Sequence, residues 1–293
     1  HTEMGKLLGE LGSFEEAKIH FNAVIKIWES TPEKHSLFLR DNLSYSYLEL
    51  SKVNVKEGNY VTALKNAQNA LEVWQSFNDG NDTWITEFYN QIAKSYGLLG
   101  QLENAMDFYN KSLKVLAPTF ESKETFANPT TDQIVPTLPM LDILSGKAQT
   151  LKLIGLKNND EQLISNTLAT YELIGEVSDK MLLSYRNDFS RQELLNKVYQ
   201  SNAEALHLLF QLFQQTRESI FLEKSLYFLE KSKSTVLLSS LRDAQAKEFG
   251  GISSKQIDYE KDIKLKMALF ERLIQEEANK GDKADQSKLS SIY

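Results

Sequence analysis

Hydrophobic and small residues in the first 116 positions follow a helical period and recur in three blocks. Each block places a small residue, a glycine seven positions later, an alanine five positions after the glycine, and further face residues four and seven positions beyond the alanine. These residues are Gly5, Gly12, Ala17, Phe21 and Val24, then Ser51, Gly58, Ala63, Ala67 and Ala70, then Ala93, Gly100, Ala105, Tyr109 and Ser112. Spacings of 3, 4 and 7 mark one face of an α-helix, so each block predicts two helices with a turn at the glycine.

The residue types fit a tight antiparallel hairpin. A glycine ends a helix in the left-handed conformation at little cost, because it has no Cβ. The second helix of each hairpin is expected to begin two residues later, at Phe14, Tyr60 and Leu102. Small residues on both helices allow close approach, and Phe21 or Tyr109 fills the space beside them. The pattern therefore predicts an all-α stack of helical hairpins.

The turn segments resemble the core of the tetratricopeptide repeat. They read Gly-Ser-Phe-Glu-Glu-Ala at 12–17, Gly-Asn-Tyr-Val-Thr-Ala at 58–63 and Gly-Gln-Leu-Glu-Asn-Ala at 100–105. The resemblance implies an α-solenoid that winds as a right-handed superhelix. Successive alanines are separated by more residues than the ~34 of the standard repeat, so longer helices or connections are expected.

A proline-rich stretch divides the predicted array. Four of the five prolines are Pro118, Pro129, Pro136 and Pro139, which predicts a loop over 117–137 after three hairpins in 1–116. Two long, degenerate hairpins are expected in 138–245, with turns near 157–160 and 216–218. Their face residues are predicted to be Thr167, Tyr171 and Ile174 in the first hairpin, and Ser225, Leu229 and Ser232 in the second.

The end of this region resembles the last tetratricopeptide hairpin before the caspase-like domain of CHAT proteins. The resemblance rests on Glu230-Lys231-Ser232-Lys233, the leucine-rich Val236-Leu237-Leu238, and Asp243 to Ile252, and it covers most of 135–275. It implies a repeat region upstream of a peptidase-like domain that carries a His–Cys pair. Because this chain has no cysteine, no peptidase activity is implied for it.

The C-terminal part, 246–293, is expected to hold an amphipathic helix over 255–280 and a polar tail. Tyr259, Ile263, Met267, Phe270 and Ile274 advance by 4, 4, 3 and 4 residues along one face. This helix is predicted either to cap the last hairpin or to link it to another domain or chain.

Composition excludes several functions. With a net charge of −7 and a pI near 5.3, the chain lacks the basic surface that nucleic-acid binding needs. Without cysteine, disulfides and thiolate metal sites are excluded, and the four histidines form no pair at metal spacing. Gly146-Lys147 lacks the upstream glycine of a phosphate loop. We therefore predict no cofactor, no metal and no enzymatic activity.

Location is predicted from apolar patterning. No apolar run reaches the ~18 residues of a membrane helix, which predicts a cytoplasmic protein without membrane association. The sequence opens His-Thr-Glu without an initiator Met, so it is expected to derive from a longer protein. A removed signal peptide stays an alternative.

Candidate binding residues follow the small residue of each repeat. This position is Lys6, Lys52 or Lys94, and Asn90 precedes Lys94 by one turn. Tetratricopeptide arrays hold peptides in a concave groove, and some clamp carboxylates there with Lys and Asn. Leu48 stands where a second Asn would complete that clamp. An acidic, extended peptide is the predicted ligand, and the alternative is that these lysines belong to a solvated helix face.

Two functions therefore stand at this point. The first is a protein–protein interaction scaffold that regulates, or recruits partners for, a downstream CHAT peptidase-like domain. The second is a stand-alone sensor that binds a short signalling peptide in its groove.

Overall fold

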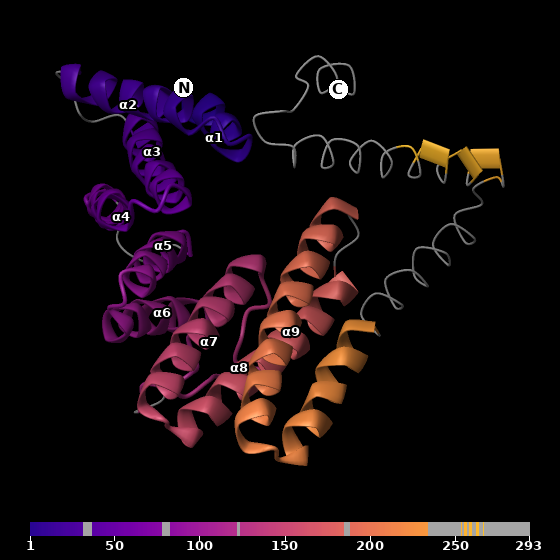
Figure 1. The fold of residues 1–293 in the computed structure, drawn as a ribbon. Helices are drawn as coiled ribbons and strands as arrows, with labels where there is room; N and C mark the ends of the chain where they lie inside the picture. Colours follow the sequence, from indigo (N-terminus) through magenta and orange to yellow (C-terminus); the bar gives the residue numbers. More distant parts are fainter. Residues whose placement is uncertain are drawn as a thin grey trace, which may run out of the picture. The chain divides into compact units, whose positions relative to one another are not determined.

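The computed structural model describes residues 1–31, 37–77, 83–121, 124–184 and 188–233, together with isolated positions between 253 and 266. The chain divides into two compact units, His1–Lys233 and Ser234–Tyr293. All helices with defined bounds lie in the first unit, and no strand occurs among the described residues (Figure 1). The predicted all-α fold is confirmed.

The first six helices form three antiparallel hairpins. They are α1 (Thr2–Glu10), α2 (Phe14–Ser30), α3 (Leu37–Lys56), α4 (Tyr60–Gln75), α5 (Ile85–Leu98) and α6 (Leu102–Leu116). The predicted starts of the second helices at Phe14, Tyr60 and Leu102 are confirmed. Each helix also contacts the first helix of the next hairpin, so the pairs stack in chain order.

The three turn glycines adopt the predicted left-handed conformation. Their φ angles are 84° at Gly12, 80° at Gly58 and 74° at Gly100. The amide that follows each glycine donates across the turn, from Ser13 to the Leu8 carbonyl at 2.9 Å in the first hairpin. This bond closes a Schellman motif, which satisfies a carbonyl at the helix end. A Cβ at these glycines would meet nothing within 4 Å, so backbone conformation alone selects glycine.

Small residues hold the paired helices together. Ala17, Ala63 and Ala105 are completely buried. A Cβ at Gly5 would lie 2.8 Å from the Phe21 ring, so the aromatic side chain occupies the space that glycine leaves. In the second hairpin, the Ser51 hydroxyl donates to the Ala63 carbonyl at 2.7 Å. The predicted contact face of these hairpins is confirmed.

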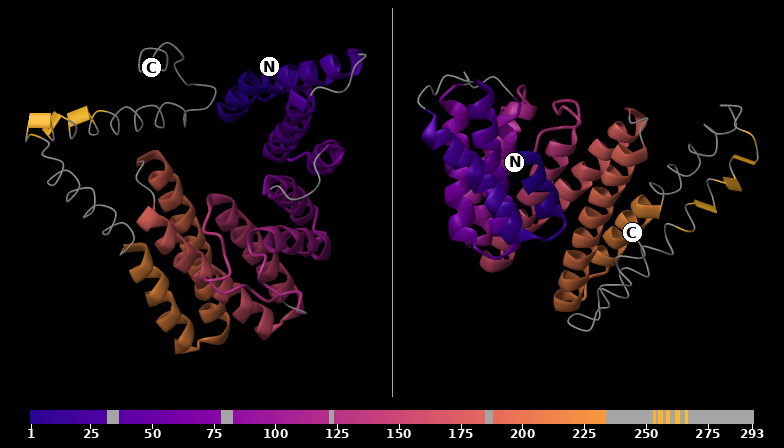
Figure 2. Two further views of the ribbon diagram at one scale, coloured as in Figure 1. Left: turned by 180° about the vertical axis from the view of Figure 1, so that it is seen from behind. Right: turned by 90° about the horizontal axis from the view of Figure 1, so that it is seen from above.

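The stack continues with longer helices. These are α7 (Leu138–Asn158), α8 (Glu161–Ser184) and α9 (Asp188–Thr216), and residues 219–233 are also helical. Figures 1 and 2 show α9 and 219–233 side by side as an antiparallel pair. The predicted turns are confirmed, with Asn159 at φ 52° and Arg217 at φ 63° in place of glycine.

The predicted face of the fourth hairpin is confirmed, whereas that of the fifth is wrong at Leu229; its other two residues, Ser225 and Ser232, are half-buried. Thr167, Tyr171 and Ile174 are buried in α8. In 219–233, however, Leu229 is 42% exposed, whereas Phe228 is 1% exposed and joins the core that α7, α8 and α9 build. One residue turns a helix by about 100°, so this correction moves the contact face to Phe228.

Residues 117–137 connect α6 to α7 and lie against the stack. The Val135 amide donates to the Leu116 carbonyl at 3.0 Å, and Asn128 Nδ2 donates to Thr170 Oγ1 in α8 at 2.8 Å. The Lys147 ammonium, buried in α7, donates to the Ala127 carbonyl. Helices α6 and α7 also contact each other directly, so hairpin stacking continues past the proline-rich stretch.

In the second unit, the described positions from 255 to 266 are helical, and Tyr259 and Ile263 are exposed. The rest of the amphipathic helix predicted for 255–280, and residues 234–245 of the predicted fifth hairpin, lie outside the described residues. Among the described helices, none has the length and hydropathy to cross a membrane.

Candidate functional site

The first helix of each hairpin contacts the first helix of the next, so α1, α3, α5, α7 and α9 follow one another along one side of the first unit. We call this surface the A-helix face. All four predicted site residues lie on these helices: Lys6 on α1, Lys52 on α3, and Asn90 and Lys94 on α5. Lys52 and Lys94 are close enough to act on each other electrostatically. None of the described interactions joins Lys6 to this pair.

Lys52 already forms an ion pair with a neighbour on its own helix. Its ammonium lies 2.8 Å from Glu49 Oε1, one turn earlier. Burial acts to lower the pKa of Lys52, but the charge of Glu49 and its hydrogen bond outweigh burial and raise this pKa overall. Lys52 therefore carries a positive charge whose field is partly compensated.

The side chain of Lys94 is exposed to solvent. In contrast to Lys52, its pKa is lowered. Loss of hydration between the helices lowers its pKa, and the positive charges of Lys52, Lys197 and Lys56 act in the same direction. Asp142 on α7 opposes them. Among the residues that the structure describes, no carboxylate forms an ion pair with Lys94. Its ammonium is therefore open to a carboxylate from outside the chain.

Glu87, one helical turn from Asn90 on α5, completes this region. Burial raises the pKa of Glu87, while Lys52 lowers it and Asp142 and Glu49 raise it. Beside Glu87 is a hollow of ≈350 Å³ with a mainly apolar lining that includes Trp84, Val135 and Pro139. The middle of the A-helix face therefore offers charged groups of both signs beside an apolar recess.

Three polar contacts join α7 to α9 farther along the same face. Lys197 Nζ lies 2.5 Å from Asp142 Oδ1, and Lys152 Nζ lies 2.5 Å from Glu204 Oε2. Between these ion pairs, the hydroxyls of Ser145 and Ser201 are 3.0 Å apart. Partner numbers increase together on both helices, so α7 and α9 run parallel. The sequence analysis missed these residues because α7 and α9 do not repeat the pattern of α1, α3 and α5.

A cavity of ≈510 Å³ opens beside these contacts, with α7 and α9 as its walls. Tyr171 of α8 also lines it, and its ring is 1% exposed. Burial, with a smaller effect from Glu204, raises the pKa of the Tyr171 phenol well above its ordinary value. The phenol is therefore a neutral hydrogen-bond donor at any physiological pH.

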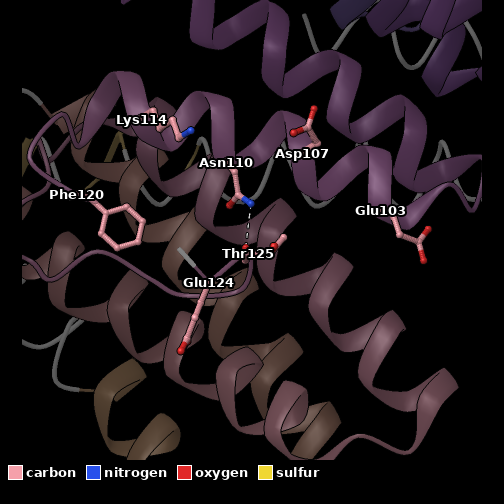
Figure 3. Close-up of a pocket in the computed structure, with 7 residues that line it drawn as sticks. All are labelled: Glu103, Asp107, Asn110, Lys114, Phe120, Glu124 and Thr125. Carbon is pink, nitrogen blue, oxygen red and sulfur yellow. Dashed lines mark hydrogen bonds between the residues drawn. The ribbon is translucent and has the colours of Figure 1, made fainter. Parts of the chain in front are cut away.

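A second pocket lies away from the A-helix face. Figure 3 shows Glu103, Asp107, Asn110 and Lys114 projecting from α6, opposite Phe120, Glu124 and Thr125 of the connector. Asn110 Nδ2 donates to the Thr125 carbonyl at 2.9 Å. This pocket of ≈240 Å³ holds none of the predicted site residues. The described part of the chain contains no group of three His, Asp or Glu side chains that could hold a metal ion.

Comparison with known families identifies the second and third hairpins. Residues 42–117, which span α3 to α6, match the family model of the tetratricopeptide repeat. This segment is a tetratricopeptide repeat region. The human nuclear autoantigenic sperm protein is 28% identical to the chain over 71 residues, which make up 24% of this chain and 9% of that protein.

Solved structures with helical repeats are also similar in part. The nearly identical TPR-like repeats of Podosopora anserina, named as kinesin light chain, share 15% identity at a TM-score of 0.45, covering 79% of this chain and 94% of that one. The BtubC (BKLC) protein from P. vanneervenii shares 14% identity at a TM-score of 0.39, covering 79% and 90%. The tetratricopeptide hairpins themselves, with their glycine turns, carry the fold assignment.

Proposed function

We propose that this tetratricopeptide array is a non-catalytic protein–protein interaction scaffold whose A-helix face binds an extended acidic segment of a partner. The observation that carries the proposal is the exposed Lys94, which has no ion pair among the described residues and whose strongest charged neighbour, Asp142, is already paired with Lys197. A partner carboxylate at this point would form an ion pair with Lys94. The adjoining apolar recess near Trp84 would accept a hydrophobic side chain of the same segment.

A charge-reversal variant tests this proposal. We expect Lys52→Glu with Lys94→Glu to weaken binding of labelled Asp/Glu-rich peptides, measured by fluorescence anisotropy, by about tenfold or more. The matched control is Lys65→Glu with Lys114→Glu, which makes the same charge change at exposed positions of α4 and α6. Binding by the parent should also weaken as salt screens the lysines.

The pH dependence has a definite sign. Only protonated Lys94 attracts a carboxylate, and its pKa in the free protein is lowered. The affinity for acidic peptides should therefore be highest below that pKa and decrease as the pH rises through it. This decrease should begin at a lower pH than it would for a lysine with an ordinary pKa. Equal affinity of both double variants for acidic peptides, at low salt and with intact far-UV circular dichroism, would refute the proposal.

We further propose that the partner belongs to a CHAT protein, as a peptidase-like domain of the same polypeptide. Support comes from the segment that resembles this family. Within it, Lys231 forms an ion pair with Asp179 of α8, and Ser232 accepts a hydrogen bond from Asn202 of α9 at 2.9 Å. The motif therefore fixes the last described helix to the array, as a junction to a further domain requires. Sequencing the complete reading frame tests this, since it must encode a peptidase-like His–Cys pair.

A further inference from the structure

The cavity between α7, α8 and α9 is lined by charged side chains that form ion pairs, and by the hydroxyl of Tyr171. Asp142, Ser145 and Gln149 come from α7, and Lys197, Gln200 and Glu204 come from α9. Tyr199, His207 and other residues of α9 complete that wall, and Tyr171 contributes from α8. The cavity lies within electrostatic range of the lysine region, because Asp142 and Lys197, which line it, both act on Lys94.

The hydroxyl of Tyr171 is buried and has no hydrogen-bond partner within the described residues. A buried hydroxyl without a partner costs stability in the empty protein. At the equivalent repeat positions, Phe21 has no hydroxyl, and the Tyr109 ring packs over Gly146 of α7. The Tyr171 hydroxyl is therefore a buried polar group that makes no hydrogen bond within the described part of the hairpin.

The charges around this hydroxyl are balanced. Asp142 is paired with Lys197, and Glu204 is paired with Lys152. A charged ligand group would therefore gain little net attraction. A carboxylate that accepts one bond from a lysine still has free lone pairs, so Glu204 can accept a second hydrogen bond.

A donor beside an acceptor is the complement of an amide group. Tyr171 and Glu204 both line the cavity, and Glu204 is close enough to the Tyr171 phenol to act on it electrostatically. An amide offers a carbonyl to the phenol and an N–H to the carboxylate at the same time. A hydroxyl is also neutral, but its single oxygen must serve as both donor and acceptor, whereas an amide presents the two functions on separate atoms. Alkyl groups offer neither function, and an ammonium ion only donates and carries a charge.

We propose that this cavity binds a carboxamide of a peptide ligand, whose carbonyl accepts from Tyr171 and whose N–H donates to Glu204. The inference rests on the proposed function, because it requires that the A-helix face binds peptides. It adds a specificity element at the α7–α9 end, separate from the acidic contacts at Lys52 and Lys94.

The experiment selects ligands from a displayed library of random 12-residue peptides on the full chain. Affinities of the selected peptides are then measured for the parent, Tyr171→Phe and Tyr199→Phe. We expect Tyr171→Phe to weaken binding about tenfold or more, since one buried hydrogen bond is lost. Tyr199 is a largely exposed phenol of the same cavity, so Tyr199→Phe should change affinity less than about twofold.

Folding of the variant is a separate readout. Because Tyr171→Phe removes a buried polar atom without a partner, its urea midpoint should equal or exceed that of the parent. If this variant nevertheless misfolds, Glu204→Gln replaces it. An amide in place of the carboxylate removes the strong acceptor, so affinity for the selected peptides should again fall.

Substitutions in the ligand identify the source of the amide. Each Asn or Gln of a selected peptide is changed to Leu and to Asp, and both forms are measured against the parent and Tyr171→Phe. A side-chain amide in the cavity makes one such change costly for the parent and clearly less costly for Tyr171→Phe, in which only the bond to Glu204 remains to be lost. If all changes are neutral while Tyr171→Phe still weakens binding, the carbonyl and the N–H in the cavity come from the peptide backbone, from two successive peptide units.

Two results overturn the inference, and they can be told apart. Selected peptides that bind Tyr171→Phe as well as the parent, but lose affinity for the Lys52→Glu, Lys94→Glu variant, refute the carboxamide site and leave the proposed function in place. Failure to select any peptide that depends on either set of residues refutes both.

Discussion

Replacing Lys147 by Met is expected to raise the urea midpoint at pH 6.5 and to remove a rise in stability that the parent shows above pH 7. The side chain is completely buried in α7, and burial lowers its pKa from the ordinary 10.5 to about 7. Its ammonium donates to the Ala127 carbonyl, and no ionisable group of the described residues offsets the burial. Met has a similar length and carries no charge.

The sign follows from proton linkage. Between pH 7 and 10.5 the unfolded chain binds a proton at Lys147 that the folded chain does not, so stability rises with pH in this window. Below pH 7 the cost of burying the charge is fully present, on the order of 5 kcal/mol. Urea unfolding at several pH values checks this, with exposed Lys65→Met as control. If the free energy of unfolding changed with pH in the same way for the parent and Lys147→Met, the lowered pKa of a buried Lys147 would be contradicted.

Replacing Gly146 by Ala is expected to destabilise the array by about 1–3 kcal/mol, because it overpacks the junction between the third and fourth hairpins. A Cβ at Gly146 would overlap with the hydroxyl and the adjoining ring carbons of Tyr109. Tyr109 is itself buried in α6, so the ring has no space to move away. At Gly97 a Cβ would meet only Ala105, at 3.9 Å. Gly97→Ala is therefore the matched control and should be neutral or stabilising.

A double-mutant cycle then identifies the cause. Tyr109→Ala removes the ring and should cost about 3–5 kcal/mol by itself, as truncation of a large buried aromatic does. Combined with Gly146→Ala, the total should be clearly less than the sum, since the clash has disappeared. Additive urea or thermal unfolding data would show that the two residues do not touch.

The first three hairpins could be predicted because each feature has a local cause. Glycine at 12, 58 and 100 is required by a positive φ, and alanine at 17, 63 and 105 is required by close helix approach. In the later hairpins, both the turn glycine and the pattern of small residues are less clear. Asn159 and Arg217 take the left-handed turn position without glycine. In the last described helix, Phe228 competes with Leu229 for the core, and periodicity alone does not decide between adjacent apolar residues.

The candidate site was predictable only where it follows the repeat. Lys52 and Lys94 come together because equivalent positions of stacked hairpins share one face. The pairs Asp142–Lys197 and Lys152–Glu204 join helices that have lost the repeat pattern, so their spacing in sequence carries no signal. In the sequence, Gly146-Lys147 could be compared only with a phosphate-binding loop, whose upstream glycine is missing. Its role in packing depends on Tyr109 and Ala127, which only the fold brings near.

The position of a bound peptide tests the central claim, binding at the A-helix face, most directly. A photoreactive p-benzoylphenylalanine is placed at Asn90 or Gln200 on this face, and in separate variants at Glu72 or Glu103, which project from α4 and α6. Each variant is irradiated with a selected labelled peptide. We predict crosslinking from Asn90 and Gln200, and only background from Glu72 and Glu103. Crosslinking mainly from Glu72 or Glu103 would place the ligand on the opposite helices and contradict the account.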